Sequence, residues 1–488
     1  MSPRATYRVL VTDDGGGRPV PDPDLGRGLW SPVEPGVDHL PVVWTSPVTP
    51  TAAVPRGAAH LGRRVVAGVV AAVVLAVLAV GTALPHVAST GSGYRTVAGA
   101  GAPASGTVPG SGSGDATPAP ADDRDTEIAA LLARRGDAVA SDDASVYAAT
   151  QTTPARTPLF GRLEALPLTM WDYRIQTTTP GSDDTVVLLD VRLHLRLDVD
   201  ATDAVVHEHL TVTRGAAGWR VSAESTADRR AQPWDLGDLT VVHGSRSLVI
   251  GIDTPTSDLR GYTRLADAAV PAVSDVWGSG WSRHPVVLVP RTTGQLARAL
   301  ARTARSLDGY AAVTTGELSD GGDRSTSALR IWLNAPSMSS LSAVGRQVVV
   351  RHEITHVATD APGTPGVPLW LEAGFAEYVG YRDSSIALGD ELRELATAVR
   401  AGRGPSALPT RATFQGSQVD LAYEGGDLAC RVIADRYGQQ ALVQVYRLTA
   451  AGTGTEAQNL EAALRTVTRS GTASLESAWR ARLRALAG

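Results

Sequence analysis

The sequence predicts an α+β protein with two folded domains, preceded by a region without regular structure. Three observations support this class. Long stretches of alternating apolar and polar residues, typical of antiparallel strands, occur between residues 186 and 213. Apolar residues at helical spacing recur through the C-terminal half. Residues 1–61 and 86–124 are instead rich in glycine, proline and small residues, so they lack the apolar content of a packed core.

The segment 62–85 begins with Arg63 and Arg64 and continues as an uncharged run from Val65 to Leu84. Twenty helical residues at about 1.5 Å each span roughly 30 Å, the thickness of a bilayer core. The next arginine is Arg95, so the positive-inside rule places the N-terminus in the cytoplasm. A cleaved signal peptide is the alternative, but the leader is long and no small-x-small cleavage site follows.

We therefore expect a disordered cytoplasmic segment 1–61, one transmembrane helix 62–85, a flexible linker 86–124 and extracytoplasmic domains held at the cell membrane. The formal charge of -5 gives no reason to expect a nucleic-acid partner. All 45 basic residues are arginine, which indicates a GC-rich genome such as that of an actinobacterium. Cys430 is the single cysteine and excludes both an intrachain disulfide and a cysteine-rich zinc site.

Residues 125–230 form the first predicted domain. A helical pattern begins near Asp125, and strands follow. Between Val186 and Asp198 the residues alternate, with Leu193, Leu195 and Leu197 on one face. Helices followed by long antiparallel strands resemble the cone-shaped sheet of NTF2-like proteins, and we expect an accessory domain of that kind.

The second predicted domain, residues 245–488, contains the motif H-E-x-x-H at His352, Glu353 and His356. Residues four apart lie on one face of a helix, so the two imidazoles point to one place and Glu353 lies beside them. Two neutral nitrogens and a neighbouring carboxylate are what a zinc hydrolase requires. The bland alternative is two helix histidines and a solvated glutamate.

A second helix is predicted from Pro368 to Tyr378, with the sequence P-L-W-L-E-A-G-F-A-E-Y. The two helices together resemble those of the gluzincin metallopeptidases, a peptidase MA-like family in which H-E-x-x-H is followed by W-L-x-E-G-x-A. The resemblance implies that the glutamate before the glycine is the third zinc ligand. It covers roughly residues 245–450, and H-E-x-x-H is its only highly specific part.

The sequence departs from the family pattern at this third ligand. Aligned without a gap, the ligand position is Ala373, and a glutamate stands one place earlier at Glu372. One residue is about 100° of helix rotation, so the shift matters. Either the helix turns to bring Glu372 to the metal, or Glu377 reaches it, or the site is incomplete. We favour Glu372 as the zinc ligand and Glu377 as a hydrogen-bond partner of a histidine.

Two further segments bear on the site. Tyr423 opens a predicted helix and resembles the tyrosine of the Y-x-K-G stretch in aminopeptidase-like gluzincins, which implies an oxyanion-stabilising hydroxyl, although Gly425 replaces the lysine. A lone tyrosine at a helix start is equally a packing residue. Leu329 to Asn334 reads as a strand leading into the motif helix, and the resemblance implies that Asn334 and Ala335 border the cleft; an ordinary edge strand is the alternative.

We thus expect a membrane-anchored, extracytoplasmic zinc metallopeptidase that hydrolyses peptide or protein substrates. Zn²⁺ would be bound by His352, His356 and Glu372. Glu353 would act as the general base for the zinc-activated water, and Tyr423 would stabilise the oxyanion. The alternative is a catalytically inactive peptidase-like fold that serves as a binding or scaffolding module in the cell envelope, and Ala373 is the residue that favours it.

Overall fold

The computed structural model describes residues 43–47, 123–152, 157–307, 310–318, 326–361, 364, 366–415 and 418–486. The predicted span 62–85 lies outside them, as do the predicted cytoplasmic segment, apart from residues 43–47, and nearly all of the predicted linker. None of the helices in the described part of the chain is long and apolar enough to cross a bilayer. The described residues form helices and two sheets, which agrees with the mixed α and β composition that the sequence predicts.

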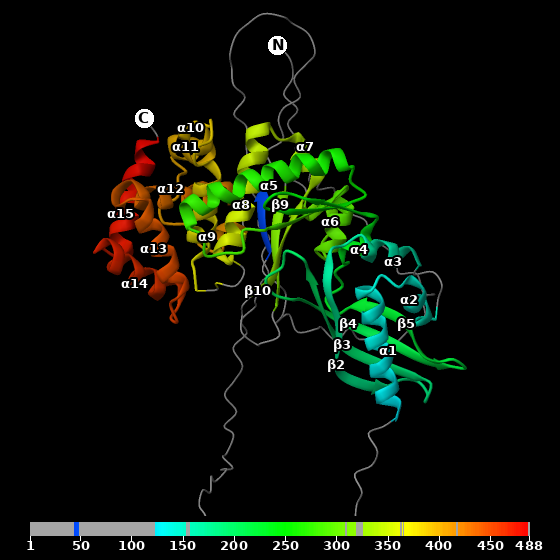
Figure 1. Cartoon of the computed structure of the whole chain (residues 1–488). Helices are drawn as coiled ribbons and strands as arrows, with labels where there is room; N and C mark the ends of the chain where they lie inside the picture. The colour runs from blue at the N-terminus through cyan, green and yellow to red at the C-terminus, as the bar shows by residue number, and fades with distance from the viewer. Residues whose placement is uncertain are drawn as a thin grey trace, which may run out of the picture. The chain divides into compact units, whose positions relative to one another are not determined.

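The first region contains a four-stranded antiparallel sheet in the order β2-β3-β4-β5, preceded by three helices (Figure 1). The helices are α1 (Asp123–Ala140), α2 (Ala144–Ala149) and α3 (Thr157–Glu164). The strands are β2 (Leu168–Pro180), β3 (Val186–Leu197), β4 (Ala204–Gly215) and β5 (Gly218–Thr226). Leu193, Leu195 and Leu197 of β3 are all buried, as the alternation predicts. The NTF2-like character of this region stays a prediction.

The second region is built on a six-stranded sheet in the order β1-β9-β10-β8-β7-β6. The strands are β1 (Val43–Pro47), β6 (Leu239–His243), β7 (Leu248–Ile252), β8 (Val286–Pro290), β9 (Tyr310–Leu318) and β10 (Thr326–Leu333). Strands β7, β8 and β10 are parallel, and every residue of β7 and β8 is buried. Continuous apolar runs of this kind are typical of strands covered on both faces.

Four strands differ from the sequence prediction. The first is β1, because residues 43–47 lie in the segment 1–61 that was expected to be disordered. Between the two predicted domains lie α4 (Pro233–Leu236) and β6, and neither these two elements nor β9 was expected. The strand predicted at Leu329 to Asn334 is β10, which lies inside the sheet between β8 and β9 rather than at an edge. It does not lead directly into the motif helix either, because α7 (Ala335–Ser340) comes between them. Strand β9 therefore lies between β10 and the outer strand β1.

Strand β1 pairs with β9 in antiparallel fashion, with residue 44 opposite Thr314. An extended segment from the N-terminal part of the chain thus forms the outer strand of the sheet. Residues 43–47 precede the predicted span, whereas β9 follows it. If the predicted span crosses the membrane, residues 43–47 and β9 lie on opposite sides of it and cannot pair in the same molecule. Protease added outside intact cells distinguishes the two arrangements, because it reaches β9 only if the domain lies outside.

Helices cover this sheet and continue beyond it to the C-terminus. They are α5 (Thr256–Trp277), α6 (Thr293–Ala299), α8 (Ala343–Thr359), α9 (Leu369–Tyr381), α10 (Leu388–Glu391), α11 (Arg393–Arg400), α12 (Val419–Tyr437), α13 (Gln439–Ala450), α14 (Glu456–Thr468) and α15 (Thr472–Ala485), with short 3-10 turns at Ala304–Leu307 and Thr413–Gln415. The last three agree with the helical spacing of apolar residues in the C-terminal half of the sequence.

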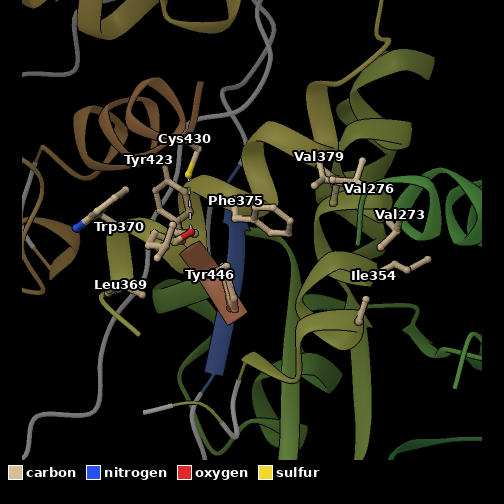
Figure 2. Packing of buried hydrophobic residues seen from close by; sticks show 14 of the residues in the cluster. Val273, Val276, Ile354, Leu369, Trp370, Phe375, Val379, Tyr423, Cys430 and Tyr446 are labelled. Carbon is tan, nitrogen blue, oxygen red and sulfur yellow. Dashed lines mark hydrogen bonds between the residues drawn. The ribbon is translucent and has the colours of Figure 1, made fainter. Parts of the chain in front are cut away.

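Helices α9 and α12 cross with their backbones in direct contact. A Cβ atom at Gly374 would lie 2.2 Å from the carbonyl carbon of Gly426, and a Cβ at Gly426 would lie 2.6 Å from the carbonyl oxygen of Trp370. Only glycine fits at both places, because real Cβ atoms do not approach backbone so closely. The neighbouring face of α9 packs into the core, where the Phe375 and Tyr446 rings lie 5.2 Å apart (Figure 2). The crossing therefore fixes the rotation of α9 about its axis.

We predict that Gly374→Ala lowers the free energy of unfolding by about 1–3 kcal/mol, because the added methyl group must force the two helices apart. Gly261→Ala is the matched control: this glycine lies within α5, and its Cβ would meet nothing within 4 Å. That change should stabilise the protein by about 0.5–1 kcal/mol through helix propensity. Denaturant unfolding measures both, and equal effects of the two changes would contradict the close crossing.

Candidate functional site

The motif helix α8 begins at the cap Ser342, whose hydroxyl accepts a hydrogen bond from the backbone N–H of Gly345. His352 and His356 lie four residues apart on it, and their Nε2 atoms are 3.0 Å from one another. Two histidine ligands on one tetrahedral zinc ion, with Zn–N bonds of about 2.0–2.1 Å, have their nitrogens about 3.3 Å apart. The two imidazoles therefore converge as metal ligands would, as the H-E-x-x-H spacing predicts.

Glu353 is completely buried, and its carboxylate faces the sheet. The Thr314 hydroxyl, also completely buried, donates a hydrogen bond of 2.6 Å to Glu353 Oε2. Thr314 comes from β9, the strand that the sequence pattern did not predict. The sequence signal that could have indicated this strand is the run of β-branched residues Val313–Thr315.

Glu377 lies on the other side of the His352 ring. Its Oε1 is 3.4 Å from His352 Nδ1, so it contacts the nitrogen that does not face His356. Burial alone would lower the pKa of His352, but the carboxylates of Glu377 and Glu353 outweigh burial and raise it. Burial and the neighbouring His352 together lower the pKa of His356 well below its usual range. Glu377 therefore occupies the place of a residue that orients a ligand, not of a ligand.

Ala373 precedes Glu377 by one turn of α9 and shares its face. Glu372 is rotated from that face by about 100° relative to Ala373. Its charged neighbours are Arg411 and Glu456, outside the histidine pair, and burial raises its pKa well above the usual range. The close crossing at Gly374 fixes the rotation of α9, and at that rotation Glu372 does not share the helix face of Glu377. The role of Glu372 as the third zinc ligand stays a prediction.

Zinc therefore fits this site only in part. The two imidazole nitrogens suit it, but the position that the resemblance implies for a third ligand is Ala373, which has only a methyl group. Among the described residues no group of three or more histidine, cysteine, aspartate or glutamate side chains is placed to hold a metal ion. The side chains that the structure describes thus do not complete a three-ligand catalytic zinc centre.

The other two predicted positions lie near the site or support the fold. Tyr423 is buried at the start of α12, and its ring centroid lies 6.3 Å from that of His352. Its ring also packs edge-on against that of Phe414, with the centroids 5.1 Å apart. The position of Tyr423 is therefore compatible with a packing role as well as with a catalytic one. Asn334 is buried and donates a hydrogen bond to the Leu307 carbonyl. This bond connects the end of β10 to the 3-10 turn that precedes β9.

Comparisons with known proteins add little to this geometry. The chain matches no protein-family model and no curated protein. Among solved structures it is similar to a mutant of a two-domain M1 zinc metallopeptidase bound to L-arginine, with 12% sequence identity, a TM-score of 0.29, and 65% of this chain and 61% of that chain covered. The chain thus spans less than two thirds of that protein. A likeness of this size does not define a fold or an activity, so the residues themselves carry the argument.

We predict that Glu377→Gln lowers the pKa of His352, because the change removes the largest charge that favours the imidazolium. Histidine-selective NMR over a pH series measures this. Glu476→Gln, which removes a carboxylate paired with Arg480 on α15, should leave the His352 titration unchanged. An unchanged His352 titration in the Glu377 variant would mean that the two side chains do not interact in solution.

Proposed function

We propose that the C-terminal domain is a metallopeptidase-like fold without a complete catalytic zinc centre, and that it binds extended polypeptide in the cell envelope. The observation that carries the proposal is the face of α9 toward His352, which presents Ala373 one turn before Glu377. Glu377 contacts the far nitrogen of His352, and Glu372 faces other residues. Two histidines alone hold zinc more weakly than the three protein ligands usual at catalytic sites.

The binding surface in this proposal is the outer edge of β9. Strand addition supplies main-chain hydrogen bonds to an extended peptide whatever its sequence, and pockets along the edge add specificity. The antiparallel pairing of residues 43–47 with β9 supports this role, because this edge accepts an extended segment there. Thr314 belongs to this strand, and its hydroxyl donates a hydrogen bond to Glu353. The predicted transmembrane helix 62–85 would hold this surface outside the cytoplasmic membrane.

A zinc metallopeptidase is the second candidate function. The 3.0 Å separation of the two Nε2 atoms favours it, as does the orienting contact of Glu377. For this function Glu353 is placed to take a proton, and a ligand other than Glu372 must complete the metal site. Hydrolysis by a bound zinc ion therefore requires a third protein ligand in addition to the two histidines.

We predict that the purified full-length protein contains much less than one zinc ion per chain, and that Ala373→Glu raises its zinc affinity. The gain should exceed the about 10- to 100-fold that an orienting partner contributes, because a missing ligand is restored. Ala373→Gln is the matched control, since it adds the same volume without a carboxylate. Elemental analysis and chelator competition measure both.

One zinc ion per wild-type chain, with no gain from Ala373→Glu, would contradict the incomplete centre and favour the metallopeptidase. Loss of peptide hydrolysis in Glu353→Gln, by about 10²-fold or more, would then identify the base.

We further predict that a synthetic peptide with the sequence of residues 40–50 binds to a chain from which residues 43–47 have been deleted. A control peptide with Trp44→Pro and Thr45→Pro should bind at least about tenfold more weakly, because proline cannot donate main-chain hydrogen bonds to β9. Fluorescence anisotropy measures both affinities. Equal binding of the two peptides would exclude strand addition as the mode of recognition.

A further inference from the structure

A small cavity of about 10 Å³, room for about one water molecule, lies beside Glu377, the acid that contacts His352. Four carboxylates line it: Glu377 from α9, Glu391 from α10, and Glu424 and Asp427 from α12. All four are buried. Burying several like charges together is unfavourable unless cations, hydrogen-bond donors or protons compensate them.

Most of these carboxylate oxygens have such partners. Glu377 contacts His352. Glu424 accepts hydrogen bonds from the backbone N–H groups of Glu394 and Leu395, at 3.2 and 2.6 Å, and so anchors the start of α11. Arg431 donates from Nε to Asp427 Oδ2 at 2.7 Å and from its terminal nitrogen to Glu391. Arg431 therefore supplies one positive charge to two acids.

Asp427 has a second oxygen that these contacts leave without a partner. The residue is 1% exposed and lines the cavity, yet Oδ1 accepts no hydrogen bond from any residue in the described part of the chain. The Glu391 side chain lies within hydrogen-bond reach of Asp427. Two carboxylates at that distance repel one another, whereas a carboxyl group donates to a carboxylate.

We propose that Glu391 and Asp427 share one proton, and that this proton holds the segment Leu388–Arg400 (α10 and α11) against α12 as a cover that alkaline pH releases. With one proton the pair carries a single negative charge, which Arg431 balances. Without the proton, two buried carboxylates face each other beside Glu377. The cover would then loosen from the side of α12 that carries Tyr423 and Glu424. This inference does not depend on whether the domain binds peptides or hydrolyses them.

The surroundings of the pair raise the pKa values of both carboxyl groups. Burial and then Asp427 raise the pKa of Glu391 to about 10, against the lowering effect of Arg431. Burial also raises the pKa of Asp427, to which Glu377 adds, while Arg431 lowers it. Burial also raises the pKa of Glu424, to about 8, and it raises the pKa values of Tyr381 and Cys430 well above their usual range.

The sign of the pH dependence follows from these raised values. A carboxyl whose pKa is higher in the folded state than in the unfolded state stabilises the fold fully below its unfolded pKa, here 4.5 for Glu391. That stabilisation is lost as the pH rises through the folded value of about 10. Deprotonation therefore weakens the attachment of the cover on the alkaline side only.

Hydrogen–deuterium exchange of the full-length protein, corrected for intrinsic rates, tests this proposal. Between about pH 6 and about pH 10 the protection of Leu388–Arg400 should fall at least about tenfold more than that of α8. Glu391→Gln retains a donor for Asp427 but cannot lose a proton, so it should remove most of that extra fall. Asp390→Asn is the matched control: this neighbouring acid pairs with Arg393 at the surface and should respond like the wild type.

Three results would overturn the shared proton. One is a pH response of Leu388–Arg400 no larger than that of α8 in the wild type. Another is a wild-type response in Glu391→Gln; if that variant does not fold, Asp427→Asn, which also supplies a donor, replaces it with the same expectation. The third is restoration of protection at alkaline pH by added Ca²⁺ or Na⁺, because a cation would then be the natural occupant of the cavity.

Discussion

The contact between Gly374 and Gly426 is the constraint on which the rest of the site depends. Two helices whose backbones touch can neither rotate nor slide past one another without collision. This contact fixes which side chains of α9 face α8. It directs Glu377 to His352 and leaves Ala373 one turn before it, while burial raises the pKa of Glu372 on another face of the helix. A single backbone contact thus decides which carboxylates the histidine pair has available.

The two imidazoles of the histidine pair converge, and Glu377 contacts the nitrogen of His352 that faces away from His356. The convergence of the two Nε2 atoms follows from helix periodicity, and burial maintains it without a third ligand. The Thr314 hydroxyl satisfies the Glu353 carboxylate, so this buried acid is paired within the protein. Such a network is stable as packing and hydrogen bonding alone, which makes a binding role compatible with the motif.

Much of this architecture is readable from local pattern. The alternation in β3, the terminal helices and the spacing of His352 and His356 each depend on neighbours within one element. The sequence also indicates which acids of α9 lie on one helix face, because Ala373 and Glu377 are four residues apart and share a face that Glu372 does not. What local pattern does not contain is β9, whose short apolar run lacks alternation, and the crossing of α9 and α12, which joins glycines far apart in the sequence.

The outer strand β1 has a consequence for any partner that uses the same edge of the sheet. A segment tethered to the surface that it occupies acts as a competitor at a fixed effective concentration, on the order of millimolar for a short flexible linker and lower for a longer one. A polypeptide arriving from outside must bind more tightly than this internal strand, or be locally abundant, to replace it. If the segment 62–85 instead separates residues 43–47 from β9 by a membrane, the competitor is absent. Membrane insertion itself would then switch the edge from self-occupied to open.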